Sequence, residues 1–107
     1  MTSSKHSKRL PDLDSEHLAI VQDILQSHIP DLEVWIFGSR ATGKAKNTSD
    51  LDIAIIANDP IDMMLLANIK DTFSESNLPF KVDIVDYGNV SPEFRKLITK
   101  EKLVLQK

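Results

Sequence analysis

The chain has 107 residues, of which 41% are hydrophobic and 27% charged, and its formal net charge is −3. This length supports a single core and excludes two ordinary domains, and the modest negative charge gives no general attraction for nucleic acid. The sequence contains no cysteine, which excludes disulfides, cysteine-ligated zinc and thiol catalysis.

The N-terminal residues 1–12 are polar and predict a disordered tail ahead of a single domain over residues 13–107. These residues contain no apolar run of the kind found in signal peptides, and no later segment has the length of a membrane span. We therefore expect a cytoplasmic protein without membrane contact.

Apolar residues at helical spacing predict a first helix over residues 15–29, capped by Asp12 or Asp14 and ended by Pro30. The next apolar run is short and rich in strand-forming residues, and it predicts a buried strand over residues 33–37. Gly38 and Ser39 then turn the chain. A short helix is expected within residues 40–46, and a polar loop follows.

The second half continues the alternation, with a strand over residues 51–57, a helix over 62–76 and a strand over 80–87. Ser91, Pro92 and Glu93 are typical of a helix start, and they predict a helix that ends near residue 100. Residues 103–105 can form a short last strand. This order indicates an α+β fold with helices packed on one small sheet.

Aspartates on the second and third strands need a chemical explanation. Side chains alternate along a strand, so Asp50 and Asp52 point to one face with their Cα atoms about 7 Å apart. Asp83 lies inside the apolar run of the third strand, and Lys81 is the one basic residue close to it on these strands. Burial of unpaired carboxylates is costly unless a cation neutralises them.

Divalent metal binding would explain these acids, and Mg²⁺ is the ion that suits carboxylates working with phosphates. The competing interpretation is that each acid only ends a strand in water. That interpretation is preferable for any single aspartate, whereas three in this arrangement favour a metal site.

The turn after the first strand has the features of a phosphate site. Gly38 allows an anion to approach the backbone closely, and Ser39 can add a hydroxyl hydrogen bond. Arg40 can offer its guanidinium to phosphate oxygens. Such a turn is weak evidence alone, but here a basic loop and the paired acids follow it.

Gly38-Ser39, ten further residues and Asp50-Leu51-Asp52 together resemble the Gly-Ser-x10-Asp-x-Asp motif of the polymerase-β-like nucleotidyltransferase superfamily. The segment over residues 37–45 further resembles minimal nucleotidyltransferase (MNT) domains, which are commonly paired with a helical HEPN protein in toxin–antitoxin systems. The resemblance implies a small mixed β-sheet flanked by helices, the catalytic palm of that superfamily.

The resemblance also implies roles for particular residues. Three carboxylates would be catalytic and ligate two Mg²⁺ ions: Asp50, Asp52 and Asp83. Three residues would hold the phosphates of ATP: Gly38, Ser39 and Arg40. AMP would pass to a hydroxyl, and the expected acceptor is a tyrosine of the HEPN toxin in a hetero-oligomer, because this short chain has no room for a second substrate-binding lobe.

Two hypotheses of different kinds remain open. The first is an antitoxin enzyme that adenylylates its HEPN partner. The alternative is a non-catalytic nucleotide-binding subunit that neutralises the partner by complex formation alone. The three acids favour the enzyme, since a scaffold has no use for buried charge. Transfer to a small molecule or to an RNA end is disfavoured by the size and net charge.

Overall fold

The computed structural model describes residues 11–107. The predicted disordered tail therefore lies outside the described residues, except for Pro11 and Asp12. Asp12 is tied to the folded part, because its N–H donates to the carbonyl oxygen of Arg40 at 2.7 Å. None of the helices within residues 11–107 combines the length and apolar character needed to cross a bilayer.

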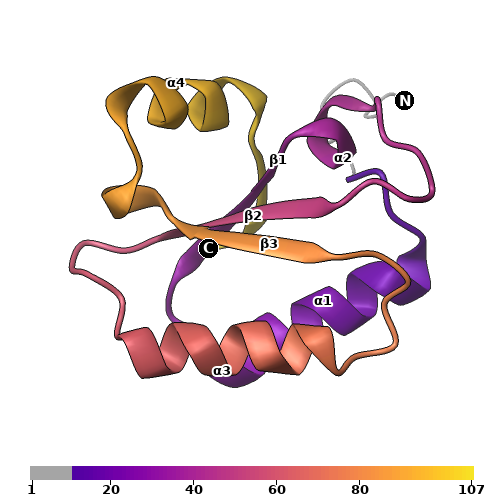
Figure 1. Ribbon diagram of the computed structural model, residues 1–107, viewed down its shortest axis with the longest axis horizontal. Coiled ribbons are helices and arrows are strands. Elements are labelled where there is room, and N and C mark those ends of the chain that lie inside the picture. Colours follow the sequence, from indigo (N-terminus) through magenta and orange to yellow (C-terminus); the bar gives the residue numbers. More distant parts are fainter. Residues whose placement is uncertain (1–10) are drawn as a thin grey trace, which may run out of the picture.

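The described elements follow the predicted order (Figure 1). They are α1 Ser15–His28, β1 Glu33–Phe37, α2 Ser39–Thr42, β2 Leu51–Ile56, α3 Met63–Ser74, β3 Val82–Asp86, the 3-10 helix η2 Tyr87–Asn89, α4 Pro92–Glu101 and β4 Leu103–Gln106. The helix expected within residues 40–46 is shorter than predicted. It ends at Thr42 because Gly43 adopts a left-handed conformation, with φ 80°, which terminates a helix.

The strands form one four-stranded mixed sheet in the order β3-β2-β1-β4. Strand β2 runs antiparallel to β1 and parallel to β3, and β4 runs antiparallel to β1. The predicted fold class, a small mixed sheet with flanking helices, is confirmed. The parallel register sets Asp52 beside Asp83, and the antiparallel register sets Phe37 on the other side of Asp52.

Helices cover both faces of the sheet (Figure 1). Helices α1 and α3 pack on one face, over a large core that includes the fully buried Val21, Leu25, Ile36, Ile53 and Ile69. Helix α4 packs on the opposite face over a smaller core, whose buried members are Trp35, Phe37, Ala54 and Ile98. Alternation along β2 and β3 therefore directs Asp52 and Asp83 to the α4 face.

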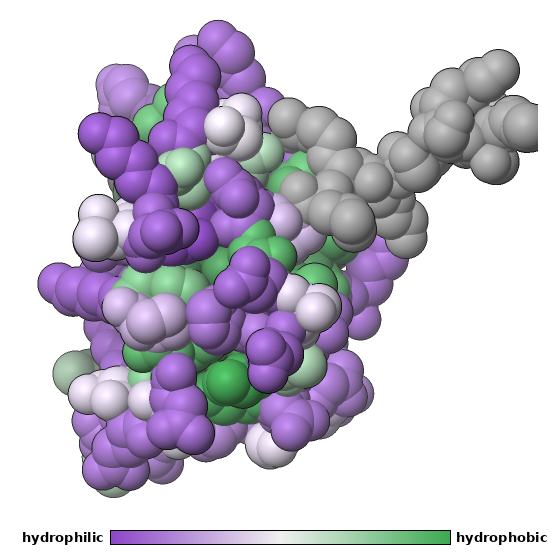
Figure 2. Space-filling view, turned by 90° about the vertical axis from the view of Figure 1, so that its right-hand side faces the viewer, coloured by the Kyte–Doolittle hydropathy of each residue, from purple (hydrophilic) through white to green (hydrophobic). Residues whose placement is uncertain are grey.

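The helix starts follow the expected capping chemistry in part. Ser91 caps α4, its hydroxyl accepting from the N–H of Phe94 at 3.2 Å. Asp14 occupies the cap position of α1 but makes no capping hydrogen bond through its side chain. The face drawn in Figure 2 is mostly hydrophilic, with hydrophobic residues visible between polar ones near its centre.

Candidate active site

Two neighbouring strands place the central acids of the site. Asp52 on β2 and Asp83 on β3 are direct register partners, and both lie on the α4 face. The Asp83 side chain is 45% exposed and Asp52 is half-buried. Asp50 immediately precedes β2 and is exposed to solvent. Asp50 lies close enough to Asp52 for its charge to contribute to the raised pKa of Asp52.

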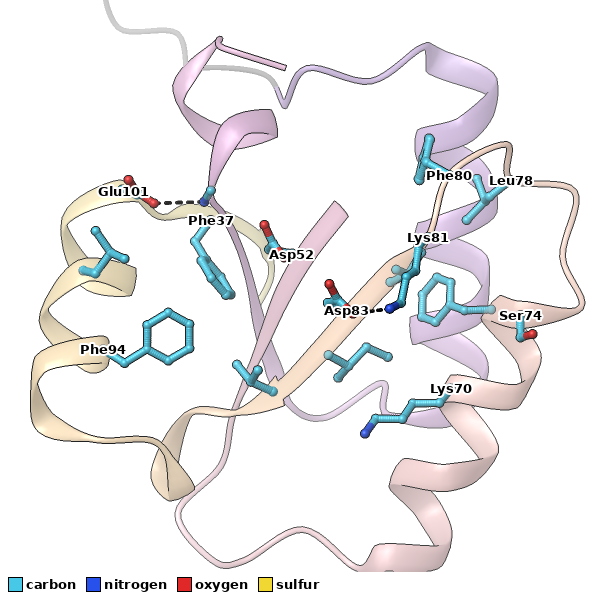
Figure 3. A pocket seen from close by; sticks show the side chains of 16 residues that line it. Phe37, Asp52, Lys70, Ser74, Leu78, Phe80, Lys81, Asp83, Phe94 and Glu101 are labelled. Atoms are coloured by element: carbon cyan, nitrogen blue, oxygen red, sulfur yellow. Dashed lines mark hydrogen bonds and ion pairs between the residues drawn. The ribbon is translucent and has the colours of Figure 1, made fainter. Parts of the chain in front are cut away.

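A cavity of about 980 Å³ opens beside these acids and is lined by Gly38, Asp52 and Asp83 (Figure 3). Three of the six predicted site residues are thus brought together in one cavity. Ser39 directly follows the lining residue Gly38, Asp50 is two positions before Asp52, and Arg40 lies elsewhere. Further wall residues come from α4 and α3: Phe94, Leu97, Glu101, Lys70 and Phe73.

The electrostatic environment of Asp52 is strongly negative. Burial, together with the charges of Asp83, Asp50 and Glu101, raises the pKa of Asp52 from 3.8 to about 6. Within the described residues, no basic side chain forms an ion pair with Asp52. The Lys81 ammonium lies 3.8 Å from Asp83, but both side chains are solvent-exposed, so this pair compensates little.

Gly38 is required by the geometry of the turn. Its φ of 77° is a conformation that residues with side chains rarely adopt, and a Cβ atom at this position would overlap Oδ2 of Asp52. The first strand therefore ends with its backbone lying directly against the Asp52 carboxylate. The Gly38 N–H donates to Oε1 of Glu101 at 3.0 Å.

Arg40 does not have the predicted position at the phosphate site. Its side chain is buried, with 6% exposure, and all three guanidinium nitrogens donate to backbone carbonyl oxygens. The acceptors include the carbonyls of Asp12, Asn47 and Ser49, and the guanidinium carbon lies 4.2 Å from the ring centroid of Phe80. We correct the prediction accordingly: Arg40 holds the loop that precedes β2.

Sequence reasoning missed Glu101, a third carboxylate in the cavity beside Asp52 and Asp83. It is the last residue of α4 and contacts Gly38 across a separation of 63 residues. One signal was available in the sequence. An acid in the last turn of a helix opposes the helix dipole, so such a residue needs a compensating contact elsewhere.

A protein-family comparison agrees with this geometry. The family model described as polymerase beta nucleotidyltransferase matches residues 20–107. The chain belongs to this nucleotidyltransferase family.

Relatives of this nucleotidyltransferase share most of its length. It is 50% identical over 95 residues to the probable protein adenylyltransferase MntA of Haemophilus influenzae, covering 89% of this chain and 83% of that protein. It is 33% identical over 69 residues to the protein adenylyltransferase MntA of Shewanella oneidensis, covering 64% of this chain and 49% of the relative. A crystal structure of a toxin–antitoxin with AMP-PNP superposes with a TM-score of 0.69 at 27% identity, covering 82% of this chain and 71% of that one.

The donor set of this nucleotidyltransferase fits the divalent metal that the family implies. Asp52 and Asp83 place carboxylate oxygens side by side on the α4 face of the β2–β3 pair, and Asp52 has no cationic side chain paired with it among residues 11–107. Hard oxygen donors of this kind suit Mg²⁺. Within the same residues, no three His, Asp or Glu side chains are close enough to share one ion.

Proposed function

We propose that this nucleotidyltransferase is a cytoplasmic antitoxin that transfers AMP from ATP to a tyrosine hydroxyl of a HEPN toxin partner. The observation that carries the proposal is the register pairing of Asp52 with Asp83 beside the Gly38 N–H, inside one cavity. Acids that would destabilise an ordinary sheet are gathered where a phosphate donor and its metal ions require them.

Apart from Arg40, which does not lie at the phosphate site, each predicted residue has a defined role in this proposal. The Gly38 N–H and the Ser39 hydroxyl bind the terminal phosphates of ATP. Asp50, Asp52 and Asp83 hold two Mg²⁺ ions, which when bound supply charge neutralisation to the reacting phosphate. Asp83, whose side chain is 45% exposed, accepts the proton of the attacking hydroxyl.

The comparisons support the acceptor and the nucleotide in this proposal. The relatives named above are protein adenylyltransferases, and the superposed toxin–antitoxin structure contains AMP-PNP, an analogue of ATP. The HEPN partner is the one implied by the resemblance of residues 37–45 to MNT domains.

Transfer is tested with the purified HEPN partner, ATP and Mg²⁺, by intact mass spectrometry of the partner. We expect the wild-type chain to add the mass of one or more AMP groups. Asp52→Asn removes a metal ligand and should abolish transfer while the variant stays folded, as judged by circular dichroism. The matched control is Asp71→Asn, which makes the same change at an exposed position on α3.

Two outcomes would overturn this proposal. Equal transfer by Asp52→Asn would remove Asp52 from the metal site. A wild-type chain that binds the partner tightly but transfers no AMP would establish the alternative, a non-catalytic antitoxin that acts by complex formation.

A further inference from the structure

Glu101 accepts a hydrogen bond from the backbone N–H of Gly38, which the proposed nucleotide would also use. Its carboxylate oxygen Oε1 accepts the Gly38 N–H at 3.0 Å, and both residues line the cavity that contains Asp52 and Asp83 (Figure 3). A backbone N–H that donates to a carboxylate makes a charge-assisted hydrogen bond, which is stronger than one between neutral groups. The contact is therefore a specific interaction between the end of α4 and the end of β1.

Apart from this hydrogen bond, the surroundings of Glu101 do little to stabilise its negative charge. It lies at the C-terminal end of α4, where the helix dipole disfavours a negative charge. Its charge also adds to those of Asp83 and Asp50 around Asp52. Within residues 11–107, Glu101 forms no ion pair with a basic side chain. The hydrogen bond from the Gly38 N–H is thus the main interaction that compensates the charge of the Glu101 carboxylate.

A carboxylate oxygen and a phosphate oxygen are equivalent acceptors for such an N–H. One backbone N–H has a single hydrogen to donate, so Glu101 and a phosphate cannot both receive it with good geometry. A phosphate bound next to Glu101 would also meet its negative charge at short range.

We infer that Glu101 is a placeholder for the nucleotide phosphate: its side chain must leave the Gly38 N–H before ATP binds, and it lowers the nucleotide affinity of the resting chain. The inference rests on the proposed function, because it assumes that Gly38 receives a phosphate.

The movement that frees Gly38 is confined to the Glu101 side chain. The next residue, Lys102, places its ammonium 4.0 Å from the ring centroid of Trp35, and β4 then pairs with β1. On the other side, Ile98 is fully buried in the smaller core. These contacts fix the backbone around Glu101, whereas its long side chain can change rotamer.

Calorimetric titration of the full chain with AMP-PNP in the presence of Mg²⁺ tests the inference. Glu101→Ala removes the competing carboxylate and should tighten nucleotide binding by roughly three- to tenfold, the equivalent of the net contribution of one ordinary hydrogen bond. Glu101→Gln keeps an acceptor but no charge and should give a smaller gain. Glu93→Ala makes the same charge change in the exposed first turn of α4 and should leave affinity unchanged.

A second measurement examines the contact without nucleotide. The chain has three glycines, so the Gly38 amide is readily assigned in a ¹⁵N correlation spectrum. Glu101→Ala should move this resonance and should leave that of Gly43 in place. An unmoved Gly38 resonance would show that the contact does not form in solution.

The results separate the inference from the proposed function. Wild-type binding with no gain, or a loss, in Glu101→Ala overturns the placeholder role alone. Failure of the wild type and of every variant to bind AMP-PNP overturns the proposed function, and the placeholder role falls with it. Tighter binding by Glu101→Ala with an unchanged Glu93→Ala control supports both.

Discussion

Asp52 carries an electrostatic cost that makes the stability of the chain depend on pH. Burial, with the neighbouring acids adding to it, raises its pKa from 3.8 to about 6. The native state therefore binds this proton more tightly than the unfolded state does. Between about pH 4 and 6 the native state carries more protons, so the free energy of unfolding falls as pH rises through this range.

Replacement of Asp52 by asparagine should remove this cost. We expect Asp52→Asn to melt a few degrees above the wild type at pH 7, with the difference disappearing below about pH 4, where both side chains are neutral. Thermal unfolding followed by circular dichroism from pH 3.5 to 7.5 measures this. A variant that melts below the wild type at pH 7 would contradict a repulsive environment at Asp52.

Gly38 and Gly43 form a matched pair that separates backbone strain from steric overlap. Both have positive φ, 77° and 80°, but a Cβ at Gly43 would meet nothing within 4 Å, whereas one at Gly38 would overlap Asp52. We expect Gly43→Ala to lower the free energy of unfolding by about 1 kcal/mol and Gly38→Ala by about 2–4 kcal/mol. Urea unfolding provides both values, and equal losses would show that Asp52 moves aside at no cost.

At the scale of elements, Arg40 organises the loop between α2 and β2. Residues 43–50 contain no helix or strand, and three of their carbonyls, at Lys46, Asn47 and Ser49, accept from its guanidinium. The loop positions Asp50 immediately before β2. Its conformation therefore depends on one buried side chain rather than on regular hydrogen bonding.

Substitution of that side chain should destabilise the chain and misplace Asp50. We expect Arg40→Met to lower the free energy of unfolding by about 2–4 kcal/mol, because several backbone carbonyls lose their shared donor and the buried guanidinium site is left without its charge-assisted hydrogen bonds. Arg40→Lys should recover little, since a single ammonium cannot reach several carbonyls at once. Urea unfolding tests both, with Lys44→Met at an exposed position as the control, and a loss below about 0.5 kcal/mol would refute the anchoring role.

The elements themselves were predictable because local patterns determine them. Alternation along residues 51–57 predicted one face for Asp50 and Asp52, whereas the pairing of Asp52 with Asp83 follows from the parallel register of β2 and β3. The short α2 was predicted too long, since the pattern over residues 40–46 does not reveal that Gly43 takes a left-handed conformation. The role of Arg40 was missed because its acceptors are backbone carbonyls, which any sequence provides.

At the scale of the whole molecule, the two faces of the sheet are covered unequally. Helices α1 and α3 share a large core, whereas α4 buries a single residue, Ile98, on the opposite face. Elements with few buried apolar side chains open at lower free energy than the rest of a domain. The helix that bears Glu101 therefore buries fewer apolar side chains than α1 or α3.

Hydrogen exchange should reveal this difference. We expect the amide protons of α4 to exchange before those of α1 and of strands β1 and β2, because α4 can open without disrupting the large core. Exchange followed by mass spectrometry resolves these segments. Protection of α4 equal to that of β2 would show that both cores open together.

Contacts between segments that are far apart in the sequence could not be predicted from the sequence. Glu101 meets Gly38 only because β4 returns along β1 and brings the end of α4 beside the start of α2. The cavity likewise depends on how α3 and α4 flank β3 from opposite faces. No pattern in a single sequence specifies such distances.

Strand β3 lies at the edge of the sheet, and the cavity draws its wall from helices on both faces of that edge. A substrate held there would keep one flank open to bulk water, since the chain adds no lid from residues 11–107 across this edge. Water would then compete with any hydroxyl for the activated phosphorus. Under the proposed function, the isolated chain should therefore hydrolyse bound nucleotide slowly. A docked protein that shields the edge should suppress this hydrolysis and supply the attacking hydroxyl.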